Sequence, residues 1–325
     1  MVATGHNVGI AFALNIAAGL ATCIGGAVVF SKSLVHLASP KSLSVALSLS
    51  AGVMLFISLV EIYGKSVEGF TAGLGEDNAD GEYECDQTCQ GNSWLAGTAC
   101  FVTGFCIIYV MDWIVHKISP DFSDELDLAD LQALEVAVDP TPPHFHATGT
   151  PITNCQLDDE KIIKFNAKSR HQLNRMGVLT AVAIAIHNLP EGVATYIAAM
   201  RDLRVGAVLA IGIALHNIPE GIAVATPVYF ATDSRCKAFL WTFISGLAEP
   251  LGGVLAWLVV GEGLNPVVEG VMFGIVTGMM VTISIKELIP TAVKYWPQGS
   301  VVTVAIFGGM LIMATSLILF AYAGV

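Results

Sequence analysis

Two short segments of the chain combine the same three kinds of metal-binding side chain. His187-Asn188-Leu189-Pro190-Glu191-Gly192 recurs, with one conservative change, as His216-Asn217-Ile218-Pro219-Glu220-Gly221. Residues four apart on an α-helix share a face, so each histidine points the same way as the glutamate of its own copy. Imidazole nitrogen with carboxylate and amide oxygen, and no thiolate, suits Zn²⁺, Fe²⁺ and Mn²⁺. The two segments therefore predict ligands for a divalent metal ion.

Both segments and a third carboxylate lie inside apolar stretches long enough to cross a bilayer. Glu249 stands near the middle of such a stretch, within Ser245–Gly253 and directly before Pro250. An ionised side chain at the bilayer centre costs roughly 3 kcal/mol, so Glu191, Glu220 and Glu249 would together cost roughly 8–10 kcal/mol if unpaired. No lysine or arginine is predicted at their depth, which leaves protonation or a divalent cation to compensate them. Purely structural hydrogen bonds between helices are the alternative, and the repetition of the motif argues against it.

The composition is that of a polytopic membrane protein. The 325 residues are 54% hydrophobic and 13% charged, with a mean hydropathy of +0.68, whereas soluble proteins carry about 25% charged residues. A transmembrane helix needs about 20 apolar residues. Eight stretches qualify: roughly 8–30, 42–63, 94–116, 176–200, 204–228, 238–261, 267–290 and 300–323. The net charge of −12 argues against nucleic acid as a partner.

The fourth and fifth predicted helices form an internal repeat. Only a few residues around Asp202 connect them, so the two helices run antiparallel. A similar sequence on antiparallel neighbours implies a local pseudo-twofold axis in the membrane plane, and inverted repeats of this kind place binding sites near the midplane. In the seventh helix, Gly270, Gly274 and Gly278 are interpreted as a close helix contact rather than as a gate.

Basic residues indicate the orientation of the chain in the membrane. They gather in one set of connections: 31–41, 117–175, 229–237 and 286–299. Both termini are therefore expected outside the cell or in a lumen. The stretch 117–174 is expected to be a largely disordered cytoplasmic loop, in which His144 and His146 either sense or deliver metal or belong to a solvated loop. Cys85 and Cys89 form a disulfide or bind metal in an outer loop, and the disulfide is favoured.

These features resemble the ZIP (Zrt/Irt-like) divalent metal-ion transporters, and within them the bacterial ZupT-like branch. The two hexapeptides carry the resemblance, supported by Ser245–Gly253 and by Lys286-Glu287-Leu288-Ile289-Pro290. The resemblance covers nearly the whole chain. It implies an all-α integral membrane protein with a single domain of eight transmembrane helices, an inverted-repeat bundle that holds metal between helices four, five and six. It also implies a homodimer.

The resemblance further implies a transport site for two metal ions. Four side chains would form one half of the site: His187, Glu191, His216 and Glu220. Three would complete the other half, with two of the glutamates bridging: Asn188, Asn217 and Glu249.

Other candidate ligands lie away from the midplane. Glu287 resembles an exit ligand, with Asp112 as a companion. Lys286 stands where some family members carry a histidine, and its charge would repel cations. Glu61 either lines an entrance or sits at the lipid headgroups, and the headgroup interpretation is favoured.

The predicted activity is secondary transport of divalent metal, chiefly zinc, into the cytoplasm across the plasma membrane or an organelle membrane. Fe²⁺, Mn²⁺ and Cd²⁺ are further expected cargoes, and no cofactor is expected. The sequence has no Walker A loop to bind ATP. One alternative is an intramembrane zinc hydrolase, which would need a His-Glu-x-x-His helix that the sequence lacks. The other is a metal receptor that binds without translocating. The chain is expected not to be an enzyme.

Overall fold

The computed structural model describes residues 5–31, 34, 39–77, 83–118, 167–260 and 265–322. The described elements are helices, except for a pair of two-residue antiparallel strands, β1 (Glu76–Asp77) and β2 (Tyr83–Glu84). The predicted all-α class is confirmed. The loop candidates His144 and His146 lie outside the described residues.

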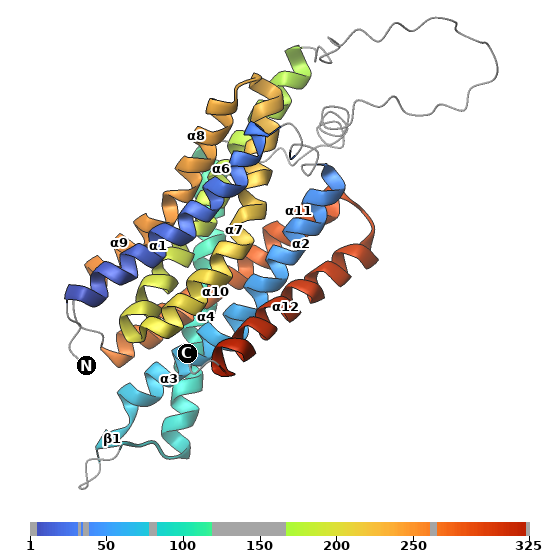
Figure 1. Ribbon diagram of the computed structural model, residues 1–325. Helices are drawn as coiled ribbons and strands as arrows, with labels where there is room; N and C mark the ends of the chain where they lie inside the picture. Colours follow the sequence, from blue (N-terminus) through green and yellow to red (C-terminus); the bar gives the residue numbers. More distant parts are fainter. Residues whose placement is uncertain are drawn as a thin grey trace, which may run out of the picture.

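Each predicted apolar stretch corresponds to a long helical segment (Figure 1). In chain order the segments are α1 (Gly5–Gly26) with the 3₁₀ turn η1 (Ala27–Phe30); α2 (Pro40–Phe56), the π-helix η3 (Ile57–Ile62) and α3 (Tyr63–Leu74); α4 (Gln87–Ile118); α6 (Ala167–Arg201); α7 (Leu203–Thr232); α8 (Arg235–Gly246) and α9 (Ala248–Val260); α10 (Pro266–Ile283), the π-helix η5 (Ser284–Leu288) and α11 (Ile289–Tyr295); and α12 (Gly299–Tyr322).

Among the described residues, 7 helices are long and apolar enough to cross a membrane. The remaining predicted span, α6, is not one of them. It is nevertheless a helix of 35 residues, and it packs along α7 inside the bundle. The multi-pass membrane character is therefore confirmed, whereas the number of eight spans is not.

The second predicted span is longer than expected. Ser39 caps α2 and Pro40 occupies its first turn, a position where the missing proline N–H has no helical partner to lose. The helical segment was expected to end at residue 63 but continues to Leu74. Lys65 lies 3.2 Å from Glu68 on the same helix, so these charges neutralise each other within the helix instead of ending it.

The sixth predicted span is broken at Leu247, between α8 and α9. Pro250 has no N–H with which to complete the helical hydrogen bond to the carbonyl of Gly246. By contrast, a single residue separates α6 from α7. Asp202 caps α7 there by accepting a 2.8 Å hydrogen bond from the backbone N–H of Arg204, which confirms the short antiparallel connection.

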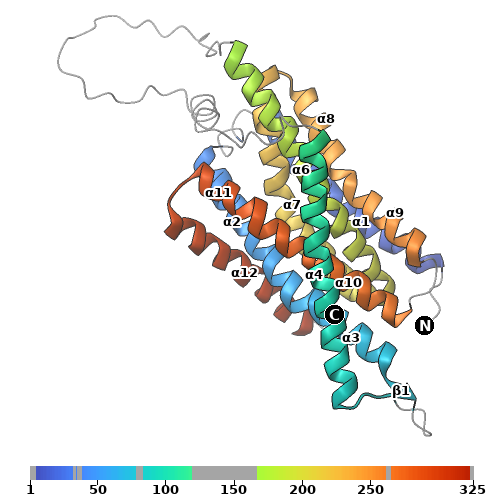
Figure 2. The same cartoon turned by 180° about the vertical axis from the view of Figure 1, so that it is seen from behind.

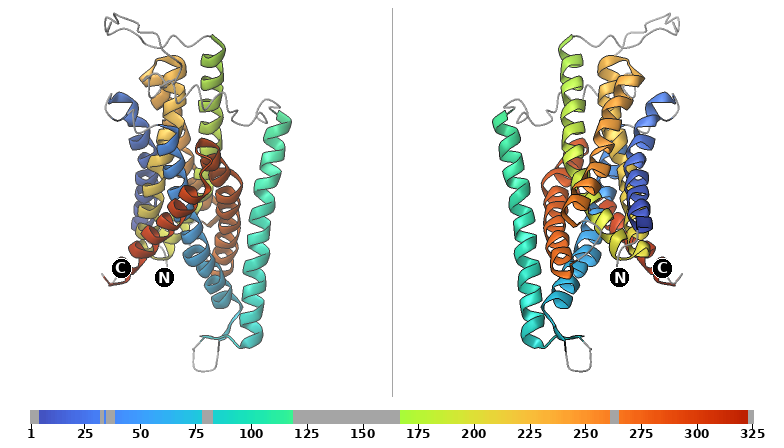
Figure 3. Two further views of the ribbon diagram at one scale, coloured as in Figure 1. Left: turned by 90° about the vertical axis from the view of Figure 1, so that its right-hand side faces the viewer. Right: turned by 90° about the vertical axis from the view of Figure 1, so that its left-hand side faces the viewer.

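The helices form two groups. The first group is α1, α6, α7, α8 and α9; the second is α2, α3, α4, α10, α11 and α12. Contacts of α2 with α7 and of α10 with α6 join them. Figure 2 and Figure 3 show α4 at the outer edge of the second group, beside α10. A Cβ atom on Gly278 of α10 would lie 1.9 Å from the carbonyl oxygen of Phe101 on α4, so the glycine at this position makes a close helix contact, as predicted.

The two ends of the helix bundle can be distinguished in Figure 1. The start of α1, the end of α12 and the β1–β2 pair lie at one end, which we call the terminal side. The start of α2, the start of α8 and the end of α11 lie at the other end, which we call the opposite side.

Close backbone contacts extend the inverted repeat beyond the two hexapeptides. A Cβ atom on Gly192 of α6 would lie 1.9 Å from the carbonyl oxygen of Glu249 on α9. One on Gly221 of α7 would lie 1.9 Å from the carbonyl oxygen of Thr22 on α1. The two contacts are equivalent, so α1 packs on α7 as α9 packs on α6. Thr22 thus occupies in α1 the position that Glu249 occupies in α9.

The same correspondence is present in the sequence. Gly19-Leu20-Ala21-Thr22 matches Gly246-Leu247-Ala248-Glu249, and a Gly-Gly pair follows each after two further residues. The two first glycines meet across the interface, since a Cβ atom on either would lie 2.6 Å from the carbonyl oxygen of the other. Accordingly, α1 and the α8–α9 pair form a second inverted repeat around α6 and α7.

Candidate metal centre

The seven midplane candidates lie on three helices of the first group. The α6 residues are His187, Asn188 and Glu191; the α7 residues are His216, Asn217 and Glu220; and Glu249 lies in the first turn of α9. All of them are buried, with exposed fractions of at most 2%. Two of the helices run through Pro190 and Pro219 without ending. Sequence reasoning therefore identified seven buried polar groups on neighbouring helices.

His216 and Glu191 form the tightest contact between the two hexapeptides. The Nε2 atom of His216 lies 2.9 Å from Oε1 of Glu191, and Nδ1 lies 3.1 Å from the carbonyl oxygen of Gly212. A carbonyl only accepts, so Nδ1 carries the proton of a neutral ring and Nε2 presents its lone pair. A lone pair facing a carboxylate is repulsive unless a proton or a metal ion lies between the two. The contact is therefore a place where a cation is required.

The two asparagines present their oxygens to the same region. Nδ2 of Asn188 donates to the carbonyl of Ser245 at 3.3 Å. Nδ2 of Asn217 donates to the carbonyl of Ala18 at 3.2 Å and to Oε2 of Glu249 at 2.9 Å. These bonds use the donor end of each amide, and both Oδ1 atoms have no hydrogen-bond partner. The amide oxygens are thus held in place and free to bind a cation.

Buried acceptors without a partner are concentrated on these residues. They include both carboxylate oxygens of Glu220, Oε2 of Glu191 and Oε1 of Glu249. Each buried polar atom left without a hydrogen bond costs about 1–3 kcal/mol, and native structures hold few of them. Six unpaired oxygens in one region, counting the two amides, indicate a site built for a positive ion.

The described side chains do not yet surround a single point. In the described part of the chain, no group of three or more His, Cys, Asp or Glu side chains is arranged closely enough to hold a metal ion. The candidates contact each other in pairs instead. Coordination of a metal ion would therefore require the side chains to rotate, with Glu220, which has no bonded partner of its own, the least restrained.

His187 faces away from this pairing and toward the second group of helices. Its Nε2 atom lies 3.1 Å from Oε2 of Glu287, although the angle is not that of a hydrogen bond. Glu287 lies in the π-helix η5, and its side chain is 30% exposed. The structure thus brings the predicted exit residue next to the first hexapeptide.

Asp112 is placed beside Lys286 rather than beside the histidines. Its Oδ2 atom lies 2.5 Å from Nζ of Lys286, and both side chains are about a third exposed. This contact changes the interpretation of Lys286, whose charge was expected to repel cations. With Asp112 neutralising it, Lys286 leaves Glu287 available to a metal ion.

Sequence reasoning missed polar residues on α1. Asn15 is fully buried, and its Nδ2 donates to the carbonyl of Gly192 at 3.0 Å. Thr22 is also fully buried, and its hydroxyl has no hydrogen-bond partner. The match between α1 and the α8–α9 pair was the signal that would have found Thr22, because it makes Thr22 the counterpart of Glu249.

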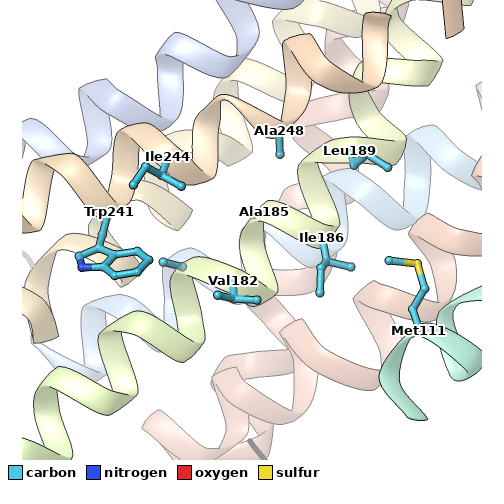
Figure 4. A pocket seen from close by; sticks show the side chains of 9 residues that line it. Met111, Val182, Ala185, Ile186, Leu189, Trp241, Ile244 and Ala248 are labelled. Atoms are coloured by element: carbon cyan, nitrogen blue, oxygen red, sulfur yellow. The ribbon is translucent and has the colours of Figure 1, made fainter. Parts of the chain in front are cut away.

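The apolar cavity shown in Figure 4 lies beside the candidate centre but is separate from it. It is lined by Met111, Ala181, Val182, Ala185, Ile186, Leu189, Trp241, Ile244 and Ala248. None of these residues is a candidate ligand, and none offers a carboxylate or an imidazole. The cavity therefore adds no metal-binding group.

In the described residues Cys85 and Cys89 are joined by a disulfide. This confirms the favoured alternative for the two cysteines. The bridge joins Cys85, which follows β2, to Cys89 in the first turn of α4, and it therefore lies beside the β1–β2 pair on the terminal side (Figure 1).

Known proteins similar to this chain match it over nearly its whole length. Residues 6–317 match the family described as "ZIP Zinc transporter". The chain is 38% identical over 311 residues to the zinc transporter ZupT of Chlorobaculum parvum, covering 95% of this chain and 97% of the relative. It is 39% identical over 313 residues to the zinc transporter ZupT of Lysinibacillus sphaericus, covering 96% and 98%. The similarity therefore extends over nearly the full length of these relatives.

Proposed function

Because the chain belongs to the ZIP zinc transporter family, as its resemblance predicted, we propose that it carries divalent metal ions, chiefly Zn²⁺, across a membrane without ATP. Its relatives are named as zinc transporters, which supports zinc as the principal cargo. Fe²⁺, Mn²⁺ and Cd²⁺ remain proposed further cargoes, since the same nitrogen and oxygen ligands suit several divalent ions. Neither a hydrolase nor a receptor is supported by the family, whose members are transporters and not enzymes.

The unpaired buried acceptors carry this proposal. Six carboxylate and amide oxygens from α6, α7 and α9 have no hydrogen-bond donor, and a dication would satisfy several of them at once. A group of acceptors paired permanently by the protein would bind no cargo. Oxygen acceptors without a hydrogen-bond donor on three helices instead support a site that a metal ion occupies during transport.

We propose two metal positions within this site. His187, Glu191, His216 and Glu220 would bind at one position, and Asn188, Asn217 and Glu249 would complete the other. The amide orientations support the second position, because both Oδ1 atoms are directed by bonds at the opposite end of each amide. Glu191 and Glu220 would bridge, since each has at least one carboxylate oxygen without a partner.

The direction of transport is proposed to be from the terminal side to the opposite side, into the cytoplasm. The distribution of basic residues among the connections supports this orientation. The Cys85–Cys89 disulfide on the terminal side supports it independently, because disulfides persist outside the cytosol. Glu287, on the opposite half of its span, would then receive metal as it leaves. The host membrane is proposed to be the plasma membrane or an organelle membrane.

A homodimer is also proposed, on the family resemblance. Large apolar side chains such as Leu95 and Val102 on α4, and Val304 and Leu311 on α12, are at least half exposed. In a membrane they contact lipid or a second copy. Light scattering of the detergent-solubilised protein would distinguish one copy from two.

Zinc flux into sealed proteoliposomes tests the proposed function. Glu220→Gln keeps the shape of the side chain but removes its charge, and should reduce the initial rate by about 100-fold or more, since loss of even an outer-shell metal partner costs about 10–100-fold. Thr226→Val on the same helix is the matched control. Its hydroxyl donates to the carbonyl of Ile222 within α7, so this variant should transport at the wild-type rate. Equal flux through the wild type and Glu220→Gln would contradict the proposal.

A further inference from the structure

A third inverted repeat links α2–η3 with α10–η5. Residues 51–62 read AGVMLFISLVEI and residues 277–288 read TGMMVTISIKEL. In this register the two stretches share Gly, Met, Ile, Ser and Glu at equivalent places. The alignment places Glu61 opposite Glu287.

Hydrogen bonds between the two helical segments confirm the register. Ser44 Oγ donates to the carbonyl of Ala292 at 2.7 Å, and Ser66 Oγ donates to the carbonyl of Gly270 at 2.6 Å. The register that pairs Glu61 with Glu287 also pairs Ser44 with Gly270 and Ser66 with Ala292. The two residue pairs are therefore symmetry counterparts, as in a two-fold interface, although the donor in both bonds is a serine of the Pro40–Leu74 span.

The local backbone of the two glutamates is also the same. Glu61 lies in the π-helix η3 and Glu287 in the π-helix η5. Short π-helical segments inside α-helices are rare and occur frequently at functional sites. Their presence at equivalent positions of two repeats indicates a shared role for the two carboxylates.

The contacts of the two glutamates differ. Glu287 lies 3.1 Å from Nε2 of His187. Glu61 is 27% exposed, and its Oε1 atom lies 4.0 Å from Nζ of Lys65. Lys65 has a closer partner, since Oε2 of Glu68 is 3.2 Å away. Oε2 of Glu68 also accepts a hydrogen bond from Arg201 at 2.7 Å, and Arg201 pairs with Glu269 as well. Glu68 and Glu269 thus supply two carboxylates for the two cations Lys65 and Arg201, which leaves Glu61 as a third carboxylate that can bind another cation.

We propose that Glu61 is a metal-binding residue on the terminal half of the transport path, which receives the dication and passes it to His216. This inference rests on the proposed function. The third repeat makes Glu61 the equivalent of Glu287, and the two hexapeptides make His216 the equivalent of His187. Since Glu287 lies beside His187, the symmetry-related partner of Glu61 is His216. Glu61 lies in the half of the Pro40–Leu74 span nearer the terminal side, and Glu287 in the half of the Pro266–Tyr295 span nearer the opposite side. The two carboxylates thus flank the buried centre.

The test measures zinc flux in vesicles of known protein orientation, with Zn²⁺ supplied first on the terminal side and then on the opposite side. Glu61→Gln should raise the KM for zinc by about tenfold or more from the terminal side, and leave the KM from the opposite side unchanged. Glu287→Gln should show the reverse. Asp86→Asn is the matched control, because it removes one carboxylate on the terminal side while an asparagine can still cap α4 as Asp86 does.

Lys65→Met separates metal binding from a structural salt bridge. If Glu61 binds metal, removing the neighbouring ammonium should lower the KM from the terminal side. If Glu61 serves only to pair with Lys65, Lys65→Met should reproduce the effect of Glu61→Gln, and that result overturns the inference. An unchanged KM in Glu61→Gln overturns it as well. Absence of zinc flux in the wild type would overturn the proposed function, and this inference with it.

Discussion

The two histidines occupy equivalent positions in two copies of one motif, but their surroundings differ. His216 is held within the first helix group, between Glu191 of the other motif and the carbonyl of Gly212. His187 reaches the second group, where it meets Glu287. A similar local sequence therefore gives two different environments, and the difference arises from the neighbouring helices. An asymmetric arrangement of symmetric parts is what a transporter open to one side at a time requires.

The largest expected loss of zinc flux comes from removing either partner of the His216–Glu191 contact in the first helix group. Glu191→Ala or His216→Ala should reduce zinc flux by about 100-fold or more, because each removes a ligand at the metal position. Initial rates in proteoliposomes measure this, with surface expression as the check that the protein folds and inserts. Uptake at the wild-type rate in both variants would remove these residues from the transport site.

The equivalence of the α6–α9 and α7–α1 backbone contacts can be tested by adding one methyl group to the glycine in each contact. Gly192→Ala and Gly221→Ala would each bring a Cβ atom to 1.9 Å from a carbonyl oxygen. Overpacking of this kind costs about 1–3 kcal/mol, so both variants should lower the thermal midpoint in detergent by similar amounts.

Gly9→Ala is the control for the two glycine variants, because a Cβ atom there has nothing within 4 Å. It should leave the midpoint unchanged or raise it slightly, since alanine favours helix over glycine. A large loss in one of Gly192→Ala and Gly221→Ala with none in the other would show that α1 and α9 are not equivalent.

A smaller loss of zinc flux is expected from removing either partner of the contact between His187 and Glu287 of the second helix group. His187→Gln and Glu287→Gln should each slow zinc flux by about tenfold, and the double variant should be no slower than either alone, because partners in one contact are not additive. A double-mutant cycle on initial rates measures this. Additive losses would mean that the two residues act separately.

The smallest effect is expected at Asp112 and Lys286. Partly exposed ion pairs contribute about 0–1 kcal/mol, so Asp112→Asn should slow flux by no more than about fivefold, through the charge that it leaves on Lys286 beside Glu287. Adding Lys286→Met should restore the rate. A loss that persists in the double variant would instead make Asp112 a ligand.

The sequence was enough to predict the apolar spans, the buried motif residues and the family, because these depend on composition and on repeated residue types. It did not predict the extension of α3 to Leu74, since Lys65 and Glu68 resemble the end of a span until their pairing is known. It also missed the repeats that include Thr22 and Glu61. Their helices are far apart in the sequence and share only a few small or polar residues, and the correspondence became clear from backbone contacts.

The pairing of side chains could not be predicted either. Which end of Asn188 or Asn217 is free depends on the carbonyls of Ser245 and Ala18, which tertiary packing brings near. Likewise, the effect of Lys286 depended on a partner in another helix. Motifs thus identify the residues of a site, while their contacts decide which atoms can bind.

Transport as proposed requires that the buried oxygens and imidazoles of α6, α7 and α9 bind divalent metal. Diffraction from crystals of the protein grown with zinc, collected at energies on both sides of the zinc absorption edge, tests it directly. We expect anomalous peaks between these three helices, at about 2.0–2.2 Å from nitrogen and oxygen atoms of the motif residues. Peaks confined to exposed side chains, with the contacts of Glu191, Glu220 and Glu249 unchanged, would contradict it.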